Sequence, residues 1–288
     1  MDAGMRGPGA GSGAGAGAAR SHAETRALPR RREWLVRWFS WYAARYVRRS
    51  FHRVRWLGAH PGAVPGDKPV VFYLNHSSWW DPMICAVLAP VLAAGRPCYA
   101  PIDAAALAKY RFFAELGFFG VERGTRRGAA SFLGISGRIL ERGEGAALWV
   151  TPQGRFVDAR ERPVRFAPGL GHLAARHPDV LFVPLAVEYV FGQERSPEVL
   201  IHWETGLAAE SESGAPGDHR RCTAWLESRM TRAQDRLAEA AVARRLGEFV
   251  DLLSSGEGVG VGGVYDLWRR AKAWARGKRS VLAHGESA

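Results

Sequence analysis

A histidine and an aspartate lie five positions apart in this chain, at His76 and Asp81. The apolar run at 69–74 before them is typical of a short buried strand, and Asp81-Pro82 followed by the apolar residues 83–88 is typical of a helix start. His76 therefore falls in a turn where a sheet delivers side chains to a cleft. An imidazole that is oriented by a carboxylate can take the proton from a hydroxyl as its oxygen attacks a carbonyl. The spacing thus predicts a pair that can act as a general base.

A second interpretation of the same residues is open. Asp81 can simply cap the helix, with His76 as a polar loop residue nearby. Histidines and aspartates at short separation are common, so the spacing alone does not choose between the two interpretations. Further motifs along the chain are needed to distinguish the catalytic interpretation from the structural one.

Residues 75–82, Asn-His-Ser-Ser-Trp-Trp-Asp-Pro, resemble the N-H-x-x-x-x-D first motif of the glycerolipid acyltransferases related to lysophosphatidate acyltransferase. Residues 120–123 resemble the second motif of that family, which ends in an Arg. Residues 151–155 stand where the family usually shows F-P-E-G-T-R, and residues 182–185 resemble its short V-P fourth motif. These segments occur in the family's order within residues 65–207, which is more specific than any one of them.

The resemblance implies an O-acyltransferase of phospholipid biosynthesis, similar to 1-acylglycerol-3-phosphate acyltransferase. Such an enzyme moves an acyl group from acyl-CoA or acyl-carrier protein to a hydroxyl of a lysophospholipid-like acceptor. By position, His76 is then the general base, Asp81 orients it, and Arg123 and Arg155 bind phosphate, for which a planar guanidinium is well suited. The acyl thioester is a co-substrate, and we expect no metal and no other cofactor.

The third motif departs from the family pattern. Thr151 stands for the usual Phe, Gln153 for the usual Glu, and one residue fewer precedes Arg155. A glutamine side chain can still donate and accept hydrogen bonds but cannot act as a base. We expect Gln153, Gly154 and Arg155 to bind substrate, with Gly154 allowing close approach of the backbone. The altered motif leaves a glycolipid or another lipid alcohol open as the acceptor. A catalytically silent, membrane-associated scaffold is a further alternative, against which the intact His/Asp pair argues.

The chain is basic, with 40 Lys and Arg against 28 Asp and Glu and a formal net charge of +12 over 288 residues. This charge favours anionic partners, of which phospholipid head groups and nucleic acid are the two candidates. With the motifs, we expect an acyl thioester donor, a lipid acceptor and a membrane surface as partners, and no nucleic acid. The three cysteines show no C-x-x-C spacing, which favours free thiols under reducing conditions.

Residues 32–60 interleave arginines with tryptophans and tyrosines at helical spacing. Aromatic rings prefer the boundary between head groups and acyl chains, and arginine can reach phosphate from there. We predict a basic amphipathic helix at a membrane interface. An ordinary helix packed on the core is the alternative, and both hold if one face packs while the other meets lipid. No run of ~18 apolar residues indicates a membrane span, so we expect a peripheral protein on the cytoplasmic face of a membrane.

Strands that alternate with helices predict an α/β fold in the acyltransferase core at residues 65–207. By the family resemblance, a central, mostly parallel or mixed sheet is flanked by helices, as in glycerol-3-phosphate acyltransferases. The expected helices lie at 101–116, 127–141 and 168–174, and the expected strands at 69–74, 146–150, 180–190 and 199–203. Outside the core and the N-terminal helix, we expect a disordered Gly/Ala-rich tail at 1–31, a linker and C-terminal helix at 208–253, and a Gly-rich hinge with a basic terminal helix at 254–288.

Overall fold

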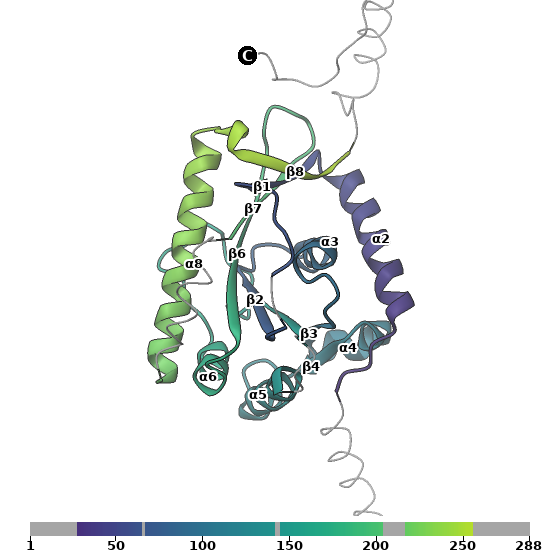
Figure 1. Cartoon of the computed structure of the whole chain (residues 1–288), viewed down its shortest axis with the longest axis vertical. Helices are drawn as coiled ribbons and strands as arrows, with labels where there is room; N and C mark the ends of the chain where they lie inside the picture. The colour runs from purple at the N-terminus through teal and green to yellow at the C-terminus, as the bar shows by residue number, and fades with distance from the viewer. Residues whose placement is uncertain (1–27, 65–66, 142–144, 204–216, 256–288) are drawn as a thin grey trace, which may run out of the picture.

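The computed structural model describes residues 28–64, 67–141, 145–203 and 217–255 (Figure 1). Most of the tail predicted at 1–31, most of the linker that begins at 208, and nearly all of the hinge and terminal helix at 254–288 lie outside these ranges. Within them, the chain forms a mixed sheet with helices on both faces. This arrangement confirms the predicted α/β fold.

The sheet formed by the described residues has eight strands in the order β4-β3-β5-β2-β6-β7-β1-β8. Their bounds are β1 Arg53–Leu57, β2 Val70–Leu74, β3 Cys98–Asp103, β4 Phe118–Val121, β5 Ala147–Val150, β6 Leu181–Val190, β7 Glu198–His202 and β8 Phe249–Ser254. The strands from β4 to β6 run parallel, whereas β7 is antiparallel to β6 and β8 is antiparallel to β1. The carboxyl ends of the parallel strands therefore meet at one edge, where loops can assemble a site.

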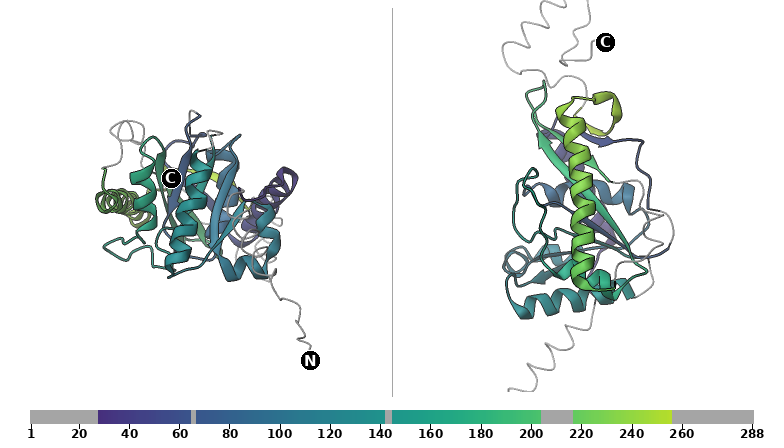
Figure 2. Two further views of the ribbon diagram at one scale, coloured as in Figure 1. Left: turned by 90° about the horizontal axis from the view of Figure 1, so that it is seen from below. Right: turned by 90° about the vertical axis from the view of Figure 1, so that its left-hand side faces the viewer.

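Helices cover both faces of this sheet (Figures 1 and 2). Their bounds are α2 Glu33–Ser50, α3 Asp81–Leu92, α4 Ala104–Lys109, α5 Arg126–Glu141, α6 Gly169–Arg176 and α8 His219–Val242, with short 3-10 helices η1 Arg111–Glu115 and η2 Leu246–Glu248. Helices α2 and α3 share a hydrophobic cluster with one face of the sheet, and α5, α6 and α8 share another with the opposite face. Each face thus has its own core.

Strand β2 lies between these two cores, and all of its residues are buried. Phe72 and Leu74 pack in the cluster with α3, whereas Val71 and Tyr73 point the other way, toward α6 and α8. Burial on both faces explains why this strand is a continuous apolar run rather than an alternating one. Because β2 is held on both sides, the residues that follow it start from a fixed position.

The helix predicted at 32–60 is ten residues too long at its C-terminal end. Helix α2 ends at Ser50, Phe51 adopts an extended backbone, and β1 inserts between β7 and β8. Val54 and Trp56 are each 1% exposed in this strand. Burying an apolar side chain contributes about 1.5–3 kcal/mol, whereas most residues differ by less than about 0.7 kcal/mol in helix propensity. Tertiary burial therefore outweighs local preference here.

A single helix at 101–116 is not observed either. The first residues of that range belong to β3, and α4 begins only after Asp103. The Asp103 carboxylate accepts hydrogen bonds from the backbone N–H groups of Ala105 and Ala106, which is the usual geometry of an N-cap. Gly117 lies two residues after η1 and has a φ of +94°, a conformation that favours glycine.

The C-terminal helix predicted to run to residue 253 is too long. Helix α8 ends at Val242, Arg244 adopts a positive φ of 49°, and β8 pairs antiparallel with β1. Phe249 and Leu253 are both buried in this strand, so the apolar residues that suggested a helix are used by the sheet edge instead. The remaining predicted elements are present, with ends shifted by no more than two residues: 69–74, 127–141, 146–150, 168–174, 180–190 and 199–203.

Candidate active site

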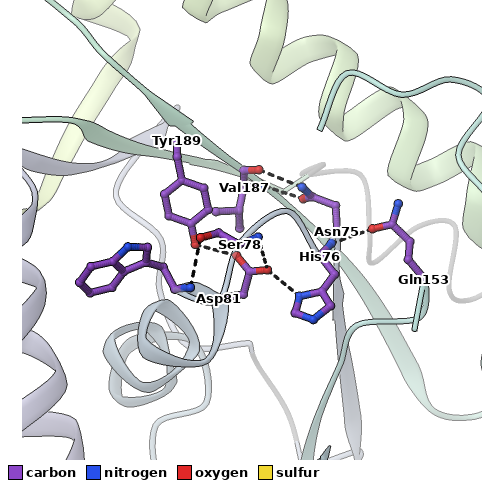
Figure 3. A network of polar contacts seen from close by, with 8 residues as sticks. Asn75, His76, Ser78, Asp81, Gln153, Val187 and Tyr189 are labelled. Atoms are coloured by element: carbon purple, nitrogen blue, oxygen red, sulfur yellow. Dashed lines mark hydrogen bonds and ion pairs between the residues drawn. The ribbon is translucent and has the colours of Figure 1, made fainter. Parts of the chain in front are cut away.

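The loop that leaves β2 runs between two neighbouring segments of the sheet. Leu74, the last residue of β2, pairs with Leu185 of β6, but β6 continues to Val190. The extra residues of β6 therefore flank the loop after β2 on one side. On the other side lies the loop after β5, which begins at Thr151. Both neighbours contribute side chains to the site (Figure 3).

His76 and Asp81 are in direct contact in this loop. The Nδ1 atom of His76 lies 2.7 Å from Oδ2 of Asp81, and the two side chains are 20% and 1% exposed. A carboxylate only accepts hydrogen bonds, so Nδ1 carries the proton in the neutral ring, and Nε2 of that tautomer has a lone pair. Helix α3 begins at Asp81 itself, with Trp80 in the capping position. Asp81 is therefore not simply a cap, because its carboxylate orients the imidazole.

Asn75 fixes the loop to β6. Its side-chain nitrogen donates a hydrogen bond to the backbone oxygen of Val187 at 2.9 Å, and its side-chain oxygen accepts one from the Val187 N–H at 2.8 Å. Asn75 is fully buried, so both ends of the amide are paired within the protein. This double contact holds the backbone one residue before His76.

The loop after β5 holds the backbone of His76 from the other side. The Gln153 side-chain oxygen accepts a hydrogen bond from the His76 N–H at 2.7 Å, and the His76 carbonyl oxygen accepts one from the Val157 N–H at 2.8 Å. The structure thus brings Gln153 into the site as an anchor of the histidine backbone. The role predicted for Gln153 in binding substrate stays a prediction.

Two aromatic residues of the site were missed from the sequence. Tyr189 donates a hydrogen bond to Oδ1 of Asp81 at 2.6 Å. The ring of Phe156 lies against that of His76, with centroids 4.4 Å apart, and is 58% exposed. Tyr189 had a weak signal, because it follows Leu185 and Val187 at strand spacing on one face of β6. Phe156 had none, since its loop has no regular structure.

Arg123 follows β4, at the same edge of the sheet as His76 but three strands away, or roughly 14 Å by the usual strand spacing. Its Nε lies 2.7 Å from Oδ2 of Asp103, and its side chain is 66% exposed. The bond from Arg123, together with the capping N–H groups of α4, lowers the pKa of the Asp103 carboxyl. Arg123 therefore presents its guanidinium to solvent beside a carboxylate rather than to the histidine.

Gly154 and Arg155 lie in a tight turn after Gln153. The Gly154 N–H donates to the Thr151 carbonyl at 3.1 Å, and Gly154 has a φ of +67°, so its conformation favours glycine. Arg155 is 67% exposed and is paired with Glu161 at 3.3 Å. The predicted binding segment therefore follows directly on Gln153, which contacts His76. The Arg155 side chain, in contrast, pairs with Glu161 of its own loop.

An open pocket of about 610 Å³ lies away from His76. Its lining comes from α4, η1 and Gly120 of β4, and includes Leu107 and Phe112 as well as Arg111 and Glu115. The pocket lies on the β4 side of the molecule, where Arg123 follows the strand. The His76–Asp81 pair does not line this pocket, so the candidate site is defined by the hydrogen bonds described above.

Comparisons with known proteins relate the chain to acyltransferases in sequence and in fold. The acyltransferase family model matches residues 58–188, a segment that holds His76, Asp81, Arg123 and residues 151–155. Among solved structures, the 1-acyl-sn-glycerophosphate (LPA) acyltransferase PlsC from Thermotoga maritima is similar, with a TM-score of 0.50 and 13% identity. The similarity covers 72% of this chain and 80% of that chain, and at this identity it shows the fold. No curated protein sequence matches the chain.

Proposed function

We propose that the chain is a glycerolipid acyltransferase, on the strength of the acyltransferase family model that matches residues 58–188 and of the similar fold. In this proposal it moves an acyl group from a thioester to a hydroxyl of a lysophospholipid-like acceptor. The donor is acyl-CoA or acyl-carrier protein, used as a co-substrate, and the reaction needs no metal. The observation that carries the proposal is the hydrogen bond between His76 and the buried Asp81 at the carboxyl edge of the parallel strands. Such a pair suits a general base.

In the proposed reaction, Nε2 of His76 takes the proton of the acceptor hydroxyl as its oxygen attacks the thioester carbonyl carbon. Asp81 holds the ring and stabilises the imidazolium that forms. The tetrahedral intermediate collapses by breaking the carbon–sulfur bond, and the imidazolium returns the proton to the departing thiolate. The products are the new ester and a free thiol, and the enzyme is regenerated without a covalent acyl intermediate.

The acceptor is the least constrained part of the proposal. A lysophospholipid is favoured by the family resemblance. Arg123 and Arg155 stand at the positions where the family binds the phosphate of its acceptor. A glycolipid or another lipid alcohol is the alternative, because Gln153 replaces the family's usual Glu and anchors the His76 backbone instead. A direct assay distinguishes the two. Labelled acyl-CoA and acyl-carrier protein are incubated with a panel of lysophospholipids, glycolipids and lipid alcohols, and transfer to none of them would contradict the proposed activity.

Replacing either Arg123 or Arg155 with alanine is expected to raise KM for a phosphate-bearing acceptor about tenfold, which is the value of one charge-assisted hydrogen bond. KM for an uncharged lipid alcohol should change little. Arg160→Ala is the matched control, because Arg160 lies in the same loop, is 81% exposed and pairs with Asp158. If the variants and wild type have equal KM values with every phosphate-bearing acceptor, neither arginine binds the acceptor.

We further propose that α2 contacts a membrane surface. Phe39, Ala43 and Val47 are buried on one side of this helix, which packs beside α3. On the rest of its surface Trp34, Trp38, Trp41 and Tyr42 are exposed, among the exposed arginines 37, 45, 48 and 49. Exposed tryptophans beside arginines suit the interface of an anionic bilayer.

None of the helices in the described part of the chain has the length and apolar composition needed to cross a bilayer. The cytoplasmic face follows from the proposed donors, which are cytoplasmic thioesters.

The double variant Trp38→Ala/Trp41→Ala is expected to bind vesicles about tenfold more weakly than wild type, because binding scales with the apolar area that enters the interface. Sedimentation with phosphatidylcholine vesicles, with and without phosphatidylglycerol, measures this, and the arginines predict a preference for the anionic vesicles. Phe191→Ala is the control, since Phe191 is 78% exposed and lies outside α2. Wild-type binding by the double variant would contradict the proposal. Stronger binding to duplex DNA than to vesicles at equal ionic strength would favour a nucleic-acid partner.

A further inference from the structure

Tyr189 occupies the side of the Asp81 carboxylate opposite to His76 (Figure 3). Its hydroxyl donates to Oδ1 at 2.6 Å, whereas Oδ2 is 2.7 Å from His76 Nδ1 and accepts a hydrogen bond from the Ser78 N–H at 3.1 Å. The Asp81 side chain is 1% exposed, so protein donors have to replace water around it. Both carboxylate oxygens are thereby fixed in one orientation.

The Tyr189 hydroxyl is itself held in place. Its ring packs against Phe51, with centroids 5.7 Å apart, and Tyr189 lies two residues after Val187, the residue that binds Asn75. One strand, β6, therefore fixes both the start of the catalytic loop and the carboxylate at its end. Burial, and next the negative charge of Asp81, raise the pKa of Tyr189, so the phenol keeps its proton and acts as a donor.

We propose that Tyr189 is a positioning residue for the transfer reaction, because its hydroxyl holds Oδ1 of Asp81 so that Oδ2 keeps Nδ1 of His76 bonded and Nε2 turned to the acceptor. Tyr189 touches no reacting atom and acts through Asp81. This inference rests on the proposed function, since it assigns a role within that reaction. It adds a hydrogen-bond donor from β6 to the pair that the first motif supplies.

The hydroxyl also has an effect on the pH dependence of the reaction. The ionisable side chains that face Asp81 are His76 from the loop, Tyr189 from β6 and Cys85 from α3. Burial, followed by Asp81 and by Cys98 of β3, raises the pKa of the Cys85 thiol, so this thiol stays neutral. The Tyr189 hydroxyl stabilises the Asp81 carboxylate more when the His76 ring is neutral than when it is protonated. The reason is that the imidazolium itself balances the negative charge of the carboxylate. Loss of the hydroxyl therefore favours protonation of the pair, and the acid limb of activity moves to higher pH.

Tyr189→Phe is the direct test, because it removes the hydroxyl and keeps the ring. We expect kcat to fall about tenfold and the acid limb of kcat/KM against pH to move up by about half a pH unit. Tyr73→Phe is the matched control, since Tyr73 is buried and donates to the Leu226 carbonyl at 3.4 Å. Its pH profile should match that of wild type. An unmoved acid limb in Tyr189→Phe would overturn the inference.

A double-mutant cycle separates positioning from a general structural role. If Tyr189 acts through Asp81, Tyr189→Phe has no further effect on kcat in the Asp81→Asn background, whereas equal losses in both backgrounds would refute the inference. The titration of the His76 ring, followed by NMR in the free protein, gives a readout without turnover. A higher midpoint in Tyr189→Phe supports the inference even if no acceptor is acylated, and an equal midpoint overturns it. Failure of the proposed function is thus distinguishable from failure of this role.

Discussion

Replacing His76 with alanine is expected to lower kcat for acyl transfer by about 10³-fold, within the 10²- to 10⁴-fold range of general-base catalysis. Among the residues around it, Gln153 cannot accept a proton as a base, and Asp81 is buried behind the ring. No neighbour in the site therefore replaces the imidazole. The contacts of the His76 backbone with Gln153 and Val157 do not involve its side chain, so the loop is expected to keep its conformation.

The measurement is steady-state transfer of labelled acyl groups, with kcat and KM determined for wild type and variant on the same acceptor. His60→Ala is the control, because His60 is exposed and lies in a loop before β2. Circular dichroism and thermal melting establish that both variants are folded. A folded His76→Ala protein with a kcat within about threefold of wild type would reject His76 as the general base, whereas loss of activity in His60→Ala as well would point to damage outside the site.

The centre of the fold and the contact between His76 and Asp81 were predictable because their signals are local. Strand β2 is buried on both faces, which produces an unbroken apolar run, and the helix start at Asp81-Pro82 bounds the loop from the other end. With both ends placed, a separation of five residues is short enough to bring His76 onto Asp81. The direct contact at 2.7 Å agrees with the orienting role predicted for the carboxylate.

The rest of the site depends on partners that are distant in the sequence. Tyr189 is 108 positions from Asp81, and Gln153 is 77 positions from His76, so no local pattern relates them. The same limit explains the error at β1, whose partners are β7 and β8. Its residues have an acceptable helical pattern, and only the sheet edge formed by later segments makes the extended conformation preferable.

Replacing Asp81 with asparagine is expected to lower kcat by about 10²- to 10⁴-fold with little change in KM. The amide can adopt two orientations in the site. With its nitrogen toward His76, it donates to Nδ1, moves the proton to Nε2 and removes the base. With its oxygen toward His76, the tautomer is kept, but the charge that stabilises the imidazolium is gone. Both orientations slow proton transfer, and neither removes a contact that binds substrate in the proposed reaction.

The size of the Asp81→Asn effect also tests whether His76 and Asp81 work as a unit. Asp179→Asn, at an exposed loop position, is the control for the loss of one carboxylate, and it should transfer acyl groups like wild type. If Asp81 acts only through the imidazole, the double variant His76→Ala/Asp81→Asn is no slower than His76→Ala alone, because the ring that the carboxylate orients is already absent. A further large loss in the double variant would mean that Asp81 has a second role in the site. A wild-type kcat in a folded Asp81→Asn protein would instead mean that the 2.7 Å contact between His76 and Asp81 has only a structural role.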